Sequence, residues 1–120
     1  MSYAFEEITF LESAQRTSAE YLSEDFDFSK FSEIIVFLEL TAQGAYTDET
    51  LNIALQTKSP NGKYHTLESF TEVGDKTAAI PFYESIEDTN IGKTGRIKAT
   101  LAGTAKDFTF SVTAVAKRIT

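Results

Sequence analysis

The sequence predicts an all-β protein: an antiparallel β-sandwich, or a jelly-roll-like fold, of about eight strands in a single domain over residues 1–120. Apolar residues recur at every second position in several short segments that are rich in β-branched and aromatic side chains. Turn-forming residues separate these segments at intervals of roughly ten residues, which is typical of sandwiches and not of βαβ units. The hydrophobic content of 42%, with ten Phe and five Tyr, is sufficient for one packed core.

Three segments show the alternation of a half-buried strand most clearly. In residues 51–56 the apolar Leu and Ile side chains occupy the odd positions, with more polar neighbours between them. Residues 96–101 repeat this pattern at odd positions, and residues 108–114 repeat it at even positions. We therefore expect one face of each strand to lie against the core.

Residues 33–41 show a different pattern, because apolar side chains follow one another from Ile34 to Leu38 without a polar interruption. A strand that is apolar on both faces is typical of a position covered on both sides. We therefore place this segment at the centre of a sheet.

The run Ser59-Pro60-Asn61-Gly62 predicts a turn, since Pro presets φ at the second position while Asn and Gly tolerate positive φ. It should join strand 51–58 to strand 64–70 as a hairpin. A second tight turn is expected at residues 103–106.

Residues 77–82 are expected to form a short strand, and Pro81 marks a strand end or a sheet edge. Residues 84–95 are polar, contain Asn90 and two glycines, and lack a period, so they are predicted to form a surface loop. Loops of this length often carry contacts.

The N-terminal third is compatible with two local structures. Ile8, Leu11, Ala14, Ala19 and Leu22 would suit one stripe of a helix. The alternative is a strand over residues 8–13, a turn near 16–18 and a second strand over 19–26. We favour the strands, because Ser and Thr at positions 13, 17 and 18 interrupt the helical pattern.

Charge and composition exclude several classes of partner. The formal net charge is −7, and residues 1–50 contain eleven acids against only Arg16 and Lys30. A negative field disfavours DNA and other polyanions. Lys93, Arg96 and Lys98 could still form a local basic patch, but we interpret them as a solvated strand face. The absence of cysteine excludes disulfides and thiolate sites. No apolar stretch approaches the ~20 residues of a membrane span. We expect no nucleic acid and no membrane as partner, and synthesis in a cytoplasm.

No pattern in the sequence indicates catalysis, a cofactor or a metal. His65 is the only histidine, and no nucleophile-elbow pattern accompanies it. The run Gly92-Lys93-Thr94 resembles the end of a P-loop, but Glu87 stands where the motif needs glycine. Acidic clusters at 24–27, 48–49 and 84–88 lack the spacing and glycine of an EF-hand. An enzyme with a pair of opposed carboxylates is the third and weakest hypothesis.

Aromatic residues in or beside predicted loops are candidates for binding. Tyr46, Tyr64 and Tyr83 could stack on sugars, anchor a protein interface or cap the core. These alternatives remain open from the sequence.

Several stretches resemble a family of small tailed-phage structural proteins encoded among head genes. The resemblance begins at residues 32–42 (SEIIVFLELTA) and extends to 50–56 (TLNIALQ), 59–67 (SPNGKYHTL), 107–112 (DFTFSV) and 8–14 (ITFLESA). It thus covers most of the chain in the right order. Relatives often place an aromatic such as Trp in the hairpin, where this chain has Tyr64 and His65, and the chain contains no Trp.

The resemblance implies a virion component with a β-sandwich fold, a decoration or cement protein that attaches to the assembled head and stabilises it. The implied partners are the major capsid protein and further copies of the chain, in a homo-oligomer such as a trimer. The implied locations are the virion and, during assembly, the host cytoplasm. The second hypothesis is a carbohydrate-binding or host-recognition module of a virion, with a glycan as ligand.

We expect a protein interface at Tyr3, Phe5, Tyr46, Tyr64 and Tyr83. Residues 1–7 are a candidate N-terminal arm that could pair with the exposed strand edge of a neighbour.

Overall fold

Nine β-strands and no helix are present in residues 3–74 and 80–119, which are the residues that the computed structural model describes. The strands in chain order are β1 (Tyr3–Arg16), β2 (Glu20–Leu22), β3 (Phe26–Asp27), β4 (Phe31–Gln43), β5 (Thr50–Lys58), β6 (Tyr64–Ser69), β7 (Phe82–Asp88), β8 (Thr94–Ala102) and β9 (Phe108–Ile119).

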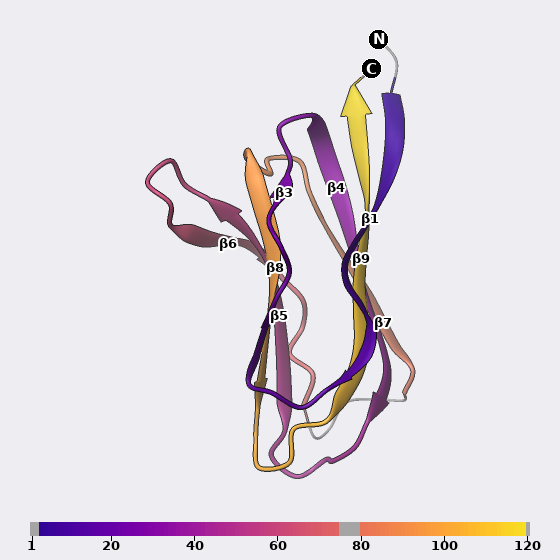
Figure 1. Ribbon diagram of the computed structural model, residues 1–120. Helices are drawn as coiled ribbons and strands as arrows, with labels where there is room; N and C mark the ends of the chain where they lie inside the picture. Colours follow the sequence, from indigo (N-terminus) through magenta and orange to yellow (C-terminus); the bar gives the residue numbers. More distant parts are fainter. Residues whose placement is uncertain (1–2, 75–79, 120) are drawn as a thin grey trace.

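The strands form two antiparallel sheets that pack face to face (Figure 1). Sheet A has the order β1-β9-β4-β7, and sheet B has the order β2-β8-β5-β6 with β3 also paired to β8. Because β2 and β3 pair in succession with β8, they act as one interrupted strand. Each sheet then has four strand positions, as in a jelly roll. The predicted antiparallel sandwich is therefore confirmed.

The core lies between the sheets and is built from the alternation visible in the sequence. The alternating apolar residues, at odd positions in segments 51–55 and 97–101 and at even positions in segment 108–114, are all buried, as predicted. Aromatic rings fill the space near β3, where the Phe10 ring meets those of Phe26 and Phe28 edge-on at centroid distances of 5.0 and 6.3 Å. Gly95 of β8 lies against this cluster, since a Cβ there would be 1.9 Å from the Phe28 ring.

The β5–β6 hairpin has the predicted turn. Gly62 has a φ of 84°, which favours glycine, and its N–H donates to the Ser59 carbonyl at 2.9 Å. Residues 103–106 form the predicted tight turn between β8 and β9. Local turn chemistry was sufficient to predict both connections.

The N-terminal third is strand and not helix. The strand β1 is longer than expected, and it shifts register against β9 between Thr9 and Leu11 and again between Leu11 and Ala14. Such bulges insert extra residues and break strict alternation. They explain why this segment also resembled a helical stripe.

Residues 3–7, the described part of the predicted arm, belong to the sheet of their own chain. They pair with residues 115–119 of β9. The Glu6 carboxylate accepts a hydrogen bond from Arg118 at 2.8 Å and lies 3.6 Å from the Lys30 ammonium group. These residues are therefore part of the sandwich itself, and pairing of residues 1–7 with the strand edge of a neighbour stays a prediction.

The prediction for residues 77–95 needs two corrections. Residues 75–79 lie outside the described residues, and the strand begins at Phe82, where it was expected to end. Residues 84–88, predicted as loop, form most of β7. This strand lies at the edge of sheet A, so its polar residues can alternate with Phe82 and Ile86 without burial on both sides. Pro81 directly precedes an edge strand, as expected.

Candidate binding face

The central strand β4 is covered on one side only. It lies between β9 and β7, as predicted, and Ile34 and Leu38 on its inward side are each 1% exposed. On its outward side, Ile35 is 38% exposed and Phe37 is partly exposed. The prediction of cover on both sides was therefore wrong for the outward side. Sheet B covers one side of sheet A, and no described strand lies on the other (Figure 1).

The outward side chains of β1, β9, β4 and β7 form one continuous surface, which we call the outer face of sheet A. Antiparallel pairing sets these side chains in rows across the strands. One row is Glu7, Val115, Ile35 and Glu87, and the next contains Thr9, Thr113, Phe37 and Ser85.

An apolar band crosses this face diagonally from β1 to β7. Its members are Phe5, Val115, Ile35, Phe37 and Tyr83. Phe5 is 69% exposed and Tyr83 is 63% exposed, so the two ends of the band are the most open. Exposed apolar side chains that lie together and are bordered by polar residues are typical of a contact site, whereas single scattered ones are not.

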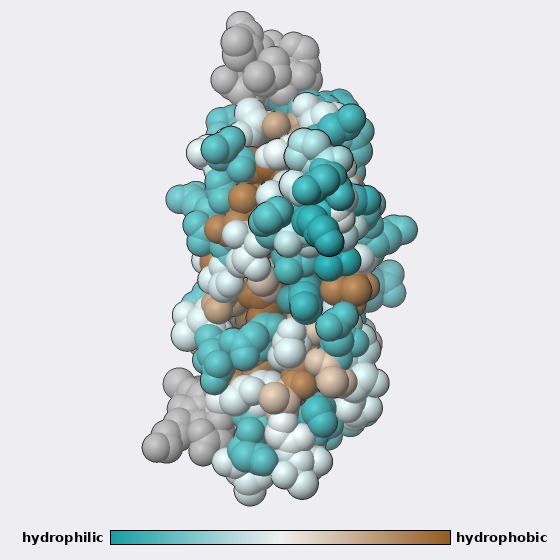
Figure 2. Space-filling view, turned by 90° about the vertical axis from the view of Figure 1, so that its left-hand side faces the viewer, coloured by the Kyte–Doolittle hydropathy of each residue, from teal (hydrophilic) through white to brown (hydrophobic). Residues whose placement is uncertain are grey.

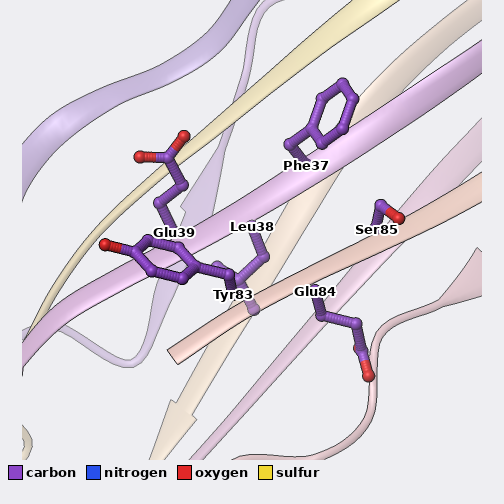
Figure 3. Close-up of a pocket in the computed structure, with 6 residues that line it drawn as sticks. All are labelled: Phe37, Leu38, Glu39, Tyr83, Glu84 and Ser85. Atoms are coloured by element: carbon purple, nitrogen blue, oxygen red, sulfur yellow. The ribbon is translucent and has the colours of Figure 1, made fainter. Parts of the chain in front are cut away.

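Shallow hollows follow the band. One of about 240 Å³ lies among Phe5, Ile35 and Val115, and another of about 280 Å³ lies between Phe37 and Tyr83. In Figure 3 the side chains of Phe37, Glu39 and Tyr83 rise on the same side of the sheet, while Glu84 points to the other side. The band therefore has relief into which a partner's side chains can fit.

Acidic side chains surround the centre of the band. Glu7, Glu39 and Glu87 are exposed, and none has an ion pair or a hydrogen bond within the described part of the chain. Glu33 forms an ion pair with Lys117. Among the outward positions of the paired rows, at residues 5–9, 111–117, 33–39 and 83–87, four carboxylates thus stand against one ammonium group, a formal charge of −3. We call Glu7, Glu39 and Glu87 the acidic rim.

On the outer face of sheet B, polar and charged side chains interact with one another. The Arg96 guanidinium lies over the Tyr64 ring at 3.4 Å from its centroid, and its Nε donates to Gln56 at 2.9 Å. The Tyr64 hydroxyl donates to the Asp25 carboxylate at 2.7 Å. This hydrogen bond, more than loss of solvation, raises the pKa of Tyr64 above its ordinary value.

A further ion pair joins Lys98 and Glu20 at 3.9 Å on the same face. Figure 2, which looks at the side of the molecule formed by sheet B, shows mostly hydrophilic and neutral surface with small separate hydrophobic areas. The charged side chains described on this face thus have partners within the chain.

The five residues predicted as an interface are distributed over the molecule. Phe5 and Tyr83 lie at opposite ends of the apolar band. Tyr46, 49% exposed, lies in the loop between β4 and β5, and Tyr64 lies on the outer face of sheet B. Tyr3 begins β1, and its side chain is outside the described residues. The structure therefore does not bring the loop tyrosines together as one sugar-binding platform.

Sequence reasoning missed the centre of the band: Val115, Ile35 and Phe37. The signal was present, because residues 34–38 are apolar at every position. This run of apolar residues predicted a strand covered on both sides. A strand that its own chain covers and a strand that a partner covers have the same local sequence, so the pattern does not distinguish them.

The residues considered above for catalysis, phosphate binding and metal binding lie at separate positions in the fold. His65 is exposed on β6 opposite Thr57, and Gly92 to Thr94 lead into a strand. Glu49 is fully buried and accepts hydrogen bonds from the N–H groups of Thr47 and Ala105 at 2.9 and 3.0 Å.

Asp48 lies beside Glu49 and connects the β4–β5 loop to the β8–β9 turn. Hydrogen bonds led by that from the Thr104 N–H lower the pKa of Asp48 to about 2. This acidic pair therefore stabilises a loop junction. In the part of the chain that the structure describes, no three His, Asp or Glu side chains converge as metal ligands. Nor do these residues include a helix of the length and hydropathy needed to cross a membrane.

The comparisons with known proteins concern the fold. No protein-family model matches the sequence, and no curated protein matches it. A chain of infectious bursal disease virus, Gx strain, is similar in structure with a TM-score of 0.64 and 11% identity over 98% of this chain. The present chain spans about a third of that viral chain, 33% of its length.

Two further solved structures match along nearly their whole length. The SPBc2 prophage-derived protein YomS has a TM-score of 0.55 and 14% identity, with 98% of this chain and 96% of YomS covered. A chain of Bacillus endospore appendages, a family of disulfide-linked pili, has a TM-score of 0.58 and 9% identity, with 99% and 90% covered. At these identities the likeness establishes a shared β-sandwich fold.

Proposed function

We propose that the chain is a structural protein of a virus particle, a decoration or cement protein that binds the assembled head of a tailed bacteriophage and stabilises it. The observation that carries this proposal is the apolar band on the outer face of sheet A, which no described part of the chain covers. Similar folds in a prophage-derived protein and in VP2 of infectious bursal disease virus, solved as a subviral particle, support it.

Such a role requires only surface recognition. A protein that binds a site present on the assembled shell, and absent from free subunits, stabilises the shell by mass action. Many equivalent sites on one particle make weak individual contacts sufficient. The apolar band surrounded by polar residues has the anatomy of such a contact, with a desolvated centre and a solvated rim. No catalytic step is part of this proposal.

Co-sedimentation tests the proposal directly. The purified chain should sediment with assembled heads of the phage that encodes it and should raise the temperature at which they are disrupted. It should not bind their unassembled subunits. Equal binding to subunits, or no binding to heads, would contradict the proposal.

A pair of matched variants tests the face. Ile35→Ser should reduce occupancy on heads at least about tenfold, since it removes an apolar side chain from the centre of the contact. Leu22→Ser is the control, because Leu22 is 43% exposed on the outer face of sheet B, against 38% for Ile35. Equal losses from the two variants would show that the outer face of sheet A is not the contact.

A further inference from the structure

Among the carboxylates that the structure describes, those of the acidic rim differ from most others in having no ion pair or hydrogen bond. Glu6 contacts Arg118 and Lys30, and Glu84 accepts two hydrogen bonds from Thr71, each of 2.7 Å. The three rim carboxylates have no comparable contact among the described residues. They nevertheless border the surface with the most exposed apolar side chains.

The positions of the rim carboxylates are set by the sheet. Glu7 on β1 and Glu87 on β7 are the ends of the row whose middle is Val115 and Ile35. Four adjacent strands are separated by three inter-strand spacings, so the two acidic positions lie about 14 Å apart on opposite sides of the apolar centre. Glu39 lies in another row, beside Tyr83.

We infer that the outer face of sheet A binds a protein surface with an apolar centre flanked by lysine or arginine side chains about 14 Å apart. This inference deepens the proposed function and rests on it only in assigning that surface to a capsid. A partner that covers the band also desolvates the nearby carboxylates. Burial of an unpaired carboxylate is unfavourable, whereas a cation from the partner offsets the desolvation and steers the encounter.

The same charges disfavour other occupants. Two copies of this face packed against each other would oppose one acidic rim to another, with a formal charge of −3 on each side. Nucleic acid and anionic lipid headgroups would also be repelled. A homo-oligomer of the chain must therefore use a different surface, and the partner on this face is a protein of opposite charge.

A titration with two model peptides tests this chemistry without any virus particle. The first is a 14-residue helical peptide of leucine and lysine, with leucines on one face and lysines beside them. The second has glutamate in place of each lysine. At low salt, the lysine peptide should shift the methyl NMR signals of Ile35 and Val115, and added salt should weaken the effect. The glutamate peptide should bind at least about tenfold more weakly.

Two triple variants separate the rim from the overall negative charge. The rim variant, Glu7→Gln with Glu39→Gln and Glu87→Gln, should weaken binding of the lysine peptide about tenfold. The control replaces Glu24, Glu68 and Glu72 by Gln in the same way, because these exposed side chains also have no hydrogen bond or ion pair among the described residues. Its affinity should stay within about twofold of the parent protein. Amide spectra of both variants verify that the fold is intact.

Equal shifts by both peptides, equal losses in the two triple variants, or shifts confined to sheet B would overturn the inference. Failure of the chain to bind heads, with the peptide results as expected, would overturn the proposed function and leave this inference standing. Head binding that survives the rim variant unchanged would overturn the inference and leave the proposed function standing.

Discussion

The outer faces of the two sheets differ in where their side chains find partners. On sheet B, Arg96 stacks on Tyr64 and hydrogen-bonds to Gln56, and Tyr64 hydrogen-bonds to Asp25. On sheet A, an apolar band faces outward, together with three carboxylates that have no ion pair or hydrogen bond among the described residues. The polar side chains described on sheet B therefore have partners within the chain, whereas sheet A combines apolar and acidic side chains as one side of a protein interface does.

The difference between the two outer faces bears on β4, which is apolar on both of its sides. Both of its faces carry residues suited to burial, but the folded chain buries only one of them. In a single soluble chain the outward apolar residues contribute little to stability and favour association. The proposed partner protein on this face would account for the alternation of Ile35 and Phe37 with core residues.

The largest effect should separate the inward from the outward side of β4. Leu38→Ala should lower the free energy of unfolding by about 2–5 kcal/mol, because it leaves a cavity in the core. Ile35→Ala should lower it by less than about 1 kcal/mol, since the side chain is 38% exposed. Urea denaturation measures both values. Similar losses at the two positions would show that the outward side is buried in the free protein.

A smaller effect is expected from the outer face of sheet B. Arg96→Ala removes the stack on Tyr64 and the hydrogen bond to Gln56, and should lower the free energy of unfolding by about 1 kcal/mol. Glu39→Ala on sheet A is the control and should change it by less than about 0.5 kcal/mol. Urea denaturation at moderate salt measures both, and a larger loss from Glu39→Ala would reverse the comparison.

The acidic rim should be dispensable for folding. Replacement of Glu7, Glu39 and Glu87 by Gln should leave the Tm unchanged or slightly higher at low salt. The change removes negative charges from a chain with a net negative charge, and so reduces repulsion without breaking an ion pair. Glu6→Gln should lower the Tm, since Glu6 contacts both Arg118 and Lys30. Thermal unfolding followed by circular dichroism measures these shifts. A marked fall in Tm for the rim variant would indicate that these carboxylates act within the chain.

The smallest effect concerns pH on the outer face of sheet B. The hydrogen bond to Asp25 raises the pKa of Tyr64 in the folded state. A group with a raised folded pKa stabilises the fold below its unfolded pKa, about 10 for tyrosine, and this stabilisation is lost as pH rises through the folded pKa.

Asp25→Ala should therefore lower the pKa of Tyr64 and reduce this alkaline loss. A ¹³C NMR titration of the tyrosine ring measures the pKa. Asp27→Ala is the control, because the Asp27 carboxylate accepts hydrogen bonds from Ser29 and none from Tyr64. An unchanged pKa in Asp25→Ala would mean that the hydrogen bond does not form in solution.

The parts of the fold that could be predicted are those that the chemistry of neighbouring residues in the sequence specifies. The alternation in residues 51–55, 97–101 and 108–114 reflects one buried and one solvated face, and it identified three core strands. The turn at residues 59–62 follows from the φ preferences of Pro, Asn and Gly. In β1 the register shifts disrupted this signal, and in β7 the edge position allowed a polar sequence that resembles a loop.

Residue patterns alone were therefore enough to predict an antiparallel sandwich, a place for β4 inside a sheet, and two faces of β4 that suit burial. Which of these faces the chain covers, and which remains open, became known only from the packing of the two sheets. Hydrophobic burial is non-directional, so an apolar side chain favours burial whatever covers it. Whether the cover comes from the same chain or from a partner depends on the arrangement of distant strands.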